Sequence, residues 1–229
     1  FIRTATTLTK PMSFTASPNN LIAHAAALPE RLATALRDES RADQRPRNQR
    51  FAPELSYGRH FGPAPSTARA AAVIALLFER DGRWHIPLTP RPDTLRHGGQ
   101  ISLPGGAVEP GETSSAAAER ELFEELGIGT GVELLGPLSE SYVYVSDFLV
   151  TPWLAVTQQT PVWQPHTDEV ARVVELPLDV LLAEQTVCTT TIQRGPIVFR
   201  AGGFRFGNDC IWGATAIILD ELVEVLRSL

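Results

Sequence analysis

Three closely spaced glutamates, Glu121, Glu124 and Glu125, are the residues most able to do chemistry in this chain. Each residue of a helix advances by about 100°, so their carboxylates fall within an arc of about 100° on one face. Carboxylates this close repel one another and raise each other's pKa values unless a cation lies among them. Oxygen ligands of this kind suit Mg²⁺ or Mn²⁺, which bind carboxylates together with substrate phosphates. The spacing predicts a divalent metal site. Taken alone, Glu124 and Glu125 could equally be a solvent-facing pair, and Glu119, on the opposite face, is expected to be a surface charge.

The segment before these glutamates has the composition of a phosphate-binding loop. Gly105, Gly106 and Gly111 allow tight bends and a close approach of backbone to phosphate. Backbone amides that lead into a helix N-terminus also favour an anion. An ion pair between Arg120 and Glu112 could fasten this loop to the helix that follows.

A helix and a sheet are expected to position these residues. Residues 70–79 form an apolar run suited to a central strand, Asp81-Gly82 is a hairpin signal, and residues 84–89 return as the partner strand. Strands and helices interleave, so the fold class is α/β (α+β), with a mixed sheet layered with helices. Further strands are expected at residues 131–139, 148–157 and 170–175, weaker ones at 187–192, 196–200 and 204–206, and helices at 114–126, 178–184 and 215–227.

The N-terminal part, residues 1–66, is expected to be an extension with a helix and a linker, ahead of a catalytic domain at residues 67–229. Apolar residues on one face predict a helix near 21–39, which Pro29 could break into two. Its arginine-rich continuation at 40–50 could bind an anion or be a solvated linker. The helix could also support a homodimer.

Composition excludes several classes of protein. The chain has 229 residues, 43% of them hydrophobic, which is enough for one well-buried domain with an extra segment. The net charge of -6 argues against a broad basic surface for nucleic acid, and no apolar run is long enough to span a membrane. Residues 1–18 have no apolar core like that of a signal peptide, so a cytoplasmic location is expected. Cys188 and Cys210 fit no zinc or redox motif and are expected to be reduced, mostly buried thiols.

The full pattern from Gly106 to Ile128 resembles the Nudix box at every fixed position. At about 7% usage per residue type, seven fixed identities coincide by chance at roughly one in 10⁸ per start point. The chain is therefore identified as a member of the Nudix hydrolase superfamily, with the resemblance covering about residues 68–229. The matched positions are the seven fixed identities and two apolar positions, namely Gly106, Glu112, Arg120, Glu121, Glu124, Glu125 and Gly127, with Leu122 and Ile128 as the apolar pair.

This resemblance implies a role for each matched residue. The glutamates matching Glu121, Glu124 and Glu125 hold the divalent cations, Mg²⁺ or Mn²⁺, while those matching Glu112 and Arg120 support the geometry of loop and helix. The implied fold is the Nudix α/β/α sandwich around a mixed sheet. The implied substrate is a small nucleotide, a nucleoside diphosphate linked to another group. Metal ions would neutralise phosphoryl oxygens and help produce hydroxide for in-line attack on phosphorus.

Residues 88–106 resemble an additional signature, that of the coenzyme A pyrophosphatases within this superfamily. That signature has a Leu-Thr-x-Arg opening, a Leu-Arg, a His, a Gly-Gln and a terminal Pro-Gly-Gly. Residues 211–219 also resemble the closing helix of that subfamily. Pro92 stands where serine is usual and Leu103 where phenylalanine is usual, and the interval from Arg96 to Gly99 is one residue short. These departures bear on the acyl or nucleotide preference more than on the phosphate chemistry.

Cationic residues in this segment could bind the substrate. Coenzyme A offers an internal diphosphate and a 3′-phosphate, which Arg91 and Arg96 could meet together with the backbone of Gly105 and Gly106. The alternative for each arginine is a structural ion pair or an exposed charge. His97 could help bind phosphate or could be a structural loop histidine.

The general base is expected on a later loop. Glu169 follows a polar stretch and precedes a strand, and related enzymes place an acidic residue from a comparable loop near the metals. Glu169 is therefore the candidate for assisting water or binding metal, and the alternative is a charge at a strand edge. Trp163 could stack on adenine or pack on its own loop.

Three functions follow from these observations. The first is metal-dependent hydrolysis of coenzyme A or its derivatives to 3′,5′-ADP and 4′-phosphopantetheine species. The second is a pyrophosphatase for ADP-ribose or another nucleoside diphosphate linked to a second group. The third is a ligand-sensing Nudix domain without turnover, which the retained glutamates of the box disfavour because such domains often lose them.

Overall fold

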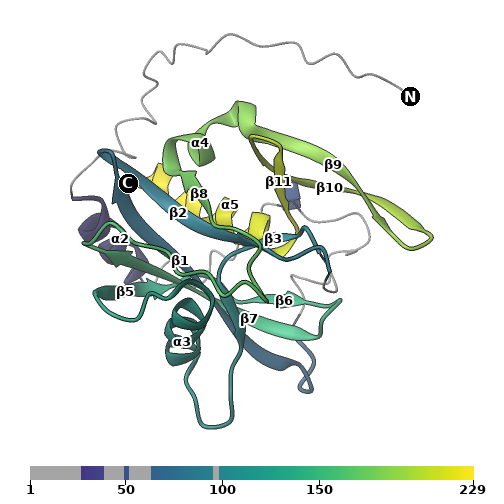
Figure 1. The fold of residues 1–229 in the computed structure, drawn as a ribbon, viewed down its shortest axis with the longest axis horizontal. Coiled ribbons are helices and arrows are strands. Elements are labelled where there is room, and N and C mark those ends of the chain that lie inside the picture. The colour runs from purple at the N-terminus through teal and green to yellow at the C-terminus, as the bar shows by residue number, and fades with distance from the viewer. Residues whose placement is uncertain (1–26, 39–48, 52–62, 95–97) are drawn as a thin grey trace.

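A mixed eight-stranded sheet with helices on both faces forms the body of the molecule (Figure 1). The computed structural model describes residues 27–38, 49–51, 63–94 and 98–229. The central strand β1 (Arg69–Arg80) pairs antiparallel with β2 (Arg83–Pro90) and parallel with β7 (Phe148–Thr157). The order along the sheet is β3-β2-β1-β7-β5, where β3 is Ile101–Ser102 and β5 is Val132–Pro137. Three further strands, β4 (Gly105–Ala107), β6 (Ser141–Val143) and β8 (Val174–Pro177), pair with β1, β7 and β2 respectively. This confirms the predicted fold class.

The turn between β1 and β2 has the geometry that the Asp-Gly pair predicts. Asp81 and Gly82 have φ angles of 53° and 70°. Positive φ at both central residues defines the turn whose twist matches that of a hairpin. Pairing starts immediately, with Arg80 opposite Arg83.

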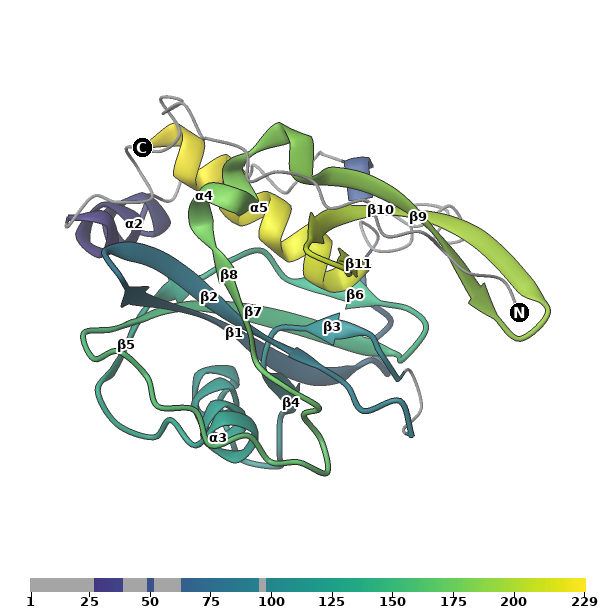
Figure 2. The same cartoon turned by 45° about the horizontal axis from the view of Figure 1, so that its top comes forward.

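The side chains on the two faces of β1 pack into two separate hydrophobic cores. Side chains alternate along a strand, so Ala72, Ile74 and Leu76 point to the face covered by α3 (Ser114–Leu126). The intervening residues point to the opposite face, where α5 (Ala214–Ser228) packs. Figure 2 shows the sheet between these two helices. Burial on both faces explains why β1 reads as a continuous apolar run instead of an alternating one.

Helix α3 has the boundaries that the sequence predicts. Thr113 caps its N-terminus by accepting a hydrogen bond from the Ala116 N–H at 3.2 Å. At the other end Gly127 adopts a left-handed conformation with φ of 74°, and its N–H donates to the Phe123 carbonyl at 2.8 Å.

A second sheet of three strands projects from the body (Figures 1 and 2). The expected strands at 196–200 and 204–206 are in fact one strand, β10 (Ile197–Phe206). The prediction of two strands was wrong because Gly202 and Gly203 stay in register with β9 (Val187–Arg194) instead of breaking the ladder.

Other elements differ from expectation in their bounds. The strand expected at 170–175 begins only at Val174, and the chain before it is held to the end of β2 by a single bond from the Ala171 N–H to the Pro90 carbonyl. Helix α2 begins at Leu28 with Pro29 in its first turn, and residues 21–26 of the expected helix lie outside the described residues. The remaining elements are α4 (Leu178–Leu182), η5 (Glu184–Thr186), β11 (Asp209–Trp212), α2 (Leu28–Leu36) and η2 (Gln49–Phe51).

The described parts of the N-terminal segment pack on this body. Leu28 and Leu32 of α2 and Phe51 of η2 are buried in the same core as α5. Arg50 pairs with the buried Asp220 of α5 at 2.7 Å. Within the part of the chain that the structure describes, no helix is both long and apolar enough to cross a membrane.

Candidate active site

Strand β4 and the loop after it bring the backbone against α3. Gly106 pairs with Ala72 of β1, and a methyl group built on Gly106 would lie 2.2 Å from Oε1 of Glu121. Gly105 has a φ of 153°, and its added methyl would lie 2.3 Å from the Ala72 carbonyl oxygen. Gly105 is therefore required for the close approach of β4 to the backbone of β1, whereas a side chain at position 106 would displace the Glu121 carboxylate.

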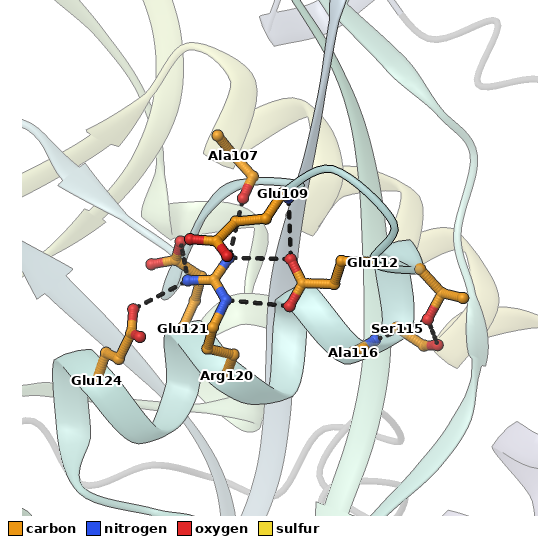
Figure 3. A network of polar contacts seen from close by, with 9 residues as sticks. Ala107, Glu109, Glu112, Ser115, Ala116, Arg120, Glu121 and Glu124 are labelled. Atoms are coloured by element: carbon orange, nitrogen blue, oxygen red, sulfur yellow. Dashed lines mark hydrogen bonds and ion pairs between the residues drawn. The ribbon is translucent and has the colours of Figure 1, made fainter.

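The predicted ion pair between Arg120 and Glu112 is present and bidentate (Figure 3). Arg120 Nε lies 3.0 Å from Glu112 Oε1 and Nη2 lies 3.2 Å from Oε2. Nη2 also donates to the Ala107 carbonyl at 2.9 Å, and the Glu109 N–H donates to Glu112 at 3.0 Å. The bond from Arg120 and then that from Glu109 lower the pKa of Glu112. Helix, loop and β4 are thus tied together through one guanidinium.

The Arg120 guanidinium also contacts two of the three glutamates that share one face of α3. Arg120 Nη1 lies 2.9 Å from both Glu121 Oε1 and Glu124 Oε2. Figure 3 shows these carboxylates on one side of Arg120 and Glu112 on the other. The Glu121 side chain is 13% exposed and that of Glu124 is 53% exposed. Burial raises the pKa of Glu121, opposed by Arg120 and assisted by the charges of Glu124 and Glu169.

Glu125 is the most buried of the three glutamates, with 9% of the residue exposed. The Gly105 N–H donates to its Oε1 at 3.1 Å. Burial raises the pKa of Glu125 to about 7, opposed by bonds from Gly105 and the Thr89 hydroxyl and assisted by the charges of Glu121 and Glu169. Glu169 is near enough to both glutamates for its charge to raise their pKa values.

The donor set fits a divalent cation by its chemistry. Glu121, Glu124 and Glu125 offer only carboxylate oxygens, which Mg²⁺ and Mn²⁺ prefer. The described residues nevertheless contain no group of three or more His, Cys, Asp or Glu side chains gathered in a metal-binding arrangement. Arg120 instead takes up one oxygen each of Glu121 and Glu124. If a metal were bound, the carboxylates of Glu121 and Glu124 would have to interact with the Arg120 guanidinium and the cation at the same time.

The loop that carries Glu169 is held by backbone hydrogen bonds at both sides. The His166 N–H donates to the Glu125 carbonyl at 3.0 Å, and the Ala171 N–H donates to the Pro90 carbonyl at 2.9 Å. Glu169 itself is exposed between these two anchors. The loop is therefore fixed to the end of α3 and to the end of β2.

An ion pair that the sequence did not predict adds a third anchor. Arg172, three residues after Glu169, lies 2.6 Å from Asp209 of β11. The two residues are 37 positions apart and carry no motif, so no local signal could have identified them. Thr89 was predicted only as part of the signature at residues 88–106, and its effect on the pKa of Glu125 was not predicted.

The expected substrate-binding residues are only partly described. Arg91 is exposed at the end of β2, and its backbone closes a loop by accepting from the Gly99 N–H and donating to the Gln100 carbonyl. Arg96 and His97 lie outside the described residues.

Trp163 packs against the body of the protein. Its indole ring meets Phe78 of β1 edge to face, with 5.1 Å between centroids, and its Nε1 donates to Glu175 of β8. These contacts favour a structural role for Trp163 over stacking on adenine. The ring packs on the sheet, and not on its own loop as the structural alternative expected.

Known proteins are similar to the part of this chain that contains the candidate active site. The NUDIX domain family model matches residues 68–188. The chain is 37% identical to Nudix hydrolase 3 of Caenorhabditis elegans over 176 residues, which cover 69% of this chain and 73% of that protein. It is 31% identical to the uncharacterized Nudix hydrolase NudL of Yersinia pestis, over 74% of this chain and 84% of that protein. The crystal structure of the M. smegmatis Nudix hydrolase RenU is similar in fold, with a TM-score of 0.52 and 18% identity over 71% of this chain and 88% of that one.

Proposed function

Because this chain belongs to the Nudix hydrolase family and is a pyrophosphohydrolase, we propose that it hydrolyses coenzyme A or its derivatives to 3′,5′-ADP and 4′-phosphopantetheine species. The segment that resembles the coenzyme A signature runs from Thr89, whose hydroxyl lowers the pKa of Glu125, to the glycines of β4. A diphosphate bound by this segment therefore lies beside the carboxylate face. This placement carries the proposal.

The three helix glutamates are the proposed ligands of Mg²⁺ or Mn²⁺. When bound, the cation would neutralise phosphoryl oxygens and lower the pKa of a bound water. The Gly105 N–H orients Glu125, and Glu112 orients Arg120 so that the loop holds its distance from the helix. In this proposal the carboxylates of Glu121 and Glu124 interact with both Arg120 and the cation.

The remaining roles concern substrate and water. Glu169 is the proposed acceptor of a proton from the attacking water, because its charge acts on Glu121 and Glu125 from the opposite loop. Arg91, with Arg96 and His97, is proposed to meet the phosphates together with the backbone of Gly105 and Gly106.

A second substrate class has a specific observation in its favour. Pro92 and Leu103 differ from the coenzyme A signature, and both lie in the segment expected to contact the substrate. ADP-ribose or another nucleoside diphosphate linked to a second group is therefore the alternative. A non-catalytic sensing domain is disfavoured because every glutamate of the box is present.

A substrate panel tests the proposal. Coenzyme A, an acyl derivative, ADP-ribose, a dinucleotide and a nucleoside triphosphate are each incubated with the full chain and Mg²⁺ or Mn²⁺, and products are identified by mass. The proposal expects 3′,5′-ADP from coenzyme A as the preferred reaction. Cleavage of ADP-ribose or another nucleotide without cleavage of coenzyme A would refute coenzyme A as the substrate and support the alternative class.

A further inference from the structure

The two cysteines of the chain lie in contact within the second sheet. Cys188 is on β9 and Cys210 is on β11, the two outer strands, and their sulfur atoms are 3.4 Å apart. Both are free thiols and both are half-buried, so they are less buried than the sequence suggested. As the chain has only two cysteines, each is the sole intramolecular thiol partner of the other.

The middle strand leaves room for this contact. Gly203 of β10 pairs directly with Cys188, and Arg205, two residues on and on the same face, pairs with Cys210. Gly203 has no side chain to separate the sulfurs. A methyl group there would lie 2.0 Å from the Ile211 carbonyl oxygen, so glycine is required by the packing of β10 on β11. The contact between the thiols therefore follows from the geometry of the sheet.

We propose that Cys188 and Cys210 are a reversible disulfide site that joins β9 to β11 across β10, formed by exchange with a low-molecular-weight disulfide. Their sulfurs must close from 3.4 Å to a bond of about 2.05 Å. Bond formation thus draws the two outer strands together. The site does not rest on the proposed substrate or on the metal.

The exchange balances in two steps. The Cys188 sulfur, as thiolate, attacks one sulfur of the small disulfide, forms a mixed disulfide and releases one small thiolate. Cys210 then loses its proton, and its sulfur attacks the Cys188 sulfur and releases the second small thiolate. Two protein thiols are oxidised, one small disulfide is reduced to two thiols, and the two protons pass to the products.

The surroundings of the sulfurs set this order. Burial, followed by the contact with Cys188, raises the pKa of the Cys210 thiol, while Arg205 and Thr190 oppose the shift. A thiol that gives up its proton less readily is the weaker first nucleophile. In this proposal Cys210 is assigned as the resolving cysteine, and the contact between the two sulfurs is the same for either order of attack. Its neighbour Asp209 holds Arg172 of the Glu169 loop, so the disulfide lies at an anchor of the candidate active site.

The experiment uses the full chain and oxidised glutathione near the ordinary thiol pKa, at about pH 8. After exchange and acid quench, intact mass and peptide mapping identify the products. The proposal expects a mass lower by two hydrogens, one peptide linking Cys188 to Cys210, and full reversal by dithiothreitol. Each single variant, Cys188→Ser or Cys210→Ser, should instead retain one glutathione as a mixed disulfide.

A control separates folded geometry from chance encounter. In urea the same chain should give at least about tenfold more mixed disulfide relative to the internal disulfide than the folded chain gives, because folding raises the effective concentration of the two thiols. Wild-type protein that stays folded and keeps both thiols, or that ends with glutathione adducts or a disulfide between two chains, would overturn the proposal. The wild-type result decides this even if a serine variant fails to fold.

Discussion

Replacement of Gly106 by alanine should separate the geometry of the site from the stability of the fold. The added methyl would lie 2.2 Å from Glu121 Oε1, closer than carbon and oxygen tolerate, so the carboxylate must move by about 1 Å. That carboxylate is held at 2.9 Å by Arg120. A displacement of about 1 Å in a catalytic array costs about 100-fold in rate, or about 2.7 kcal/mol of barrier.

Gly111→Ala provides the matched control in the same loop. A methyl on Gly111 meets nothing within 4 Å, but the residue has a φ of 85°, where a side chain costs about 1 kcal/mol or more. Gly106→Ala should therefore lose about 100-fold in kcat/KM with a small change in Tm, and Gly111→Ala should lose Tm with little change in kcat/KM. Steady-state hydrolysis with product separation and calorimetric unfolding measure the two effects. A Gly106→Ala enzyme with nearly wild-type kcat/KM would refute the reasoning.

Three further perturbations follow from individual contacts. Burial raises the pKa of Glu125 from 4.5 to about 7, so the free energy of unfolding falls as pH rises between these two values. Without divalent cations, Glu125→Gln should therefore be more stable than wild type by up to about 3 kcal/mol at about pH 8. This gain should vanish below about pH 4.5, where the carboxyl is protonated in both the folded and the unfolded chain. Denaturant unfolding at both pH values measures this, and an equal gain at both would contradict burial as the cause. Thr113→Ala removes the cap of α3 and should cost about 1 kcal/mol of unfolding free energy, which Thr113→Ser should largely restore; no loss in denaturant unfolding would mean that the cap bond contributes nothing. Asp209→Asn weakens the ion pair with Arg172 and should lower kcat several-fold and alter its pH profile, with Tm nearly unchanged; an unaltered profile would mean that this anchor does not position Glu169.

The sequence predicted the elements whose signals are local. The helix expected at residues 114–126 coincides with α3, since local residues define its ends: the Thr113 side chain caps the N-terminus and the left-handed Gly127 ends the helix. The hairpin at Asp81-Gly82 was correct because two adjacent residues determine its turn type. The bidentate pair of Arg120 and Glu112 was also predictable, since both residues belong to one contiguous motif.

Features that depend on distant parts of the chain were not predicted. Strands β3, β4 and β6 have only two or three residues, too few for a periodic pattern, and exist because longer strands pair with them. Strand β10 was divided in two because paired glycines usually indicate a turn, whereas here Gly203 permits close packing against β11 and Gly202 against Phe51 of η2. The ion pair of Arg172 with Asp209 joins a loop to a strand that sequence periodicity did not indicate.

Binding of Mn²⁺ to the folded chain tests the central claim most directly, that Glu121, Glu124 and Glu125 form a cation-binding catalytic face. The paramagnetic signal of free Mn²⁺ is titrated with wild type and with the double variant Glu121→Gln/Glu124→Gln, and Glu119→Gln serves as a control on the exposed opposite face. The account predicts that the double variant binds at least about 100-fold more weakly and loses hydrolysis, while Glu119→Gln matches wild type. Equal Mn²⁺ affinity in the double variant and wild type would contradict it.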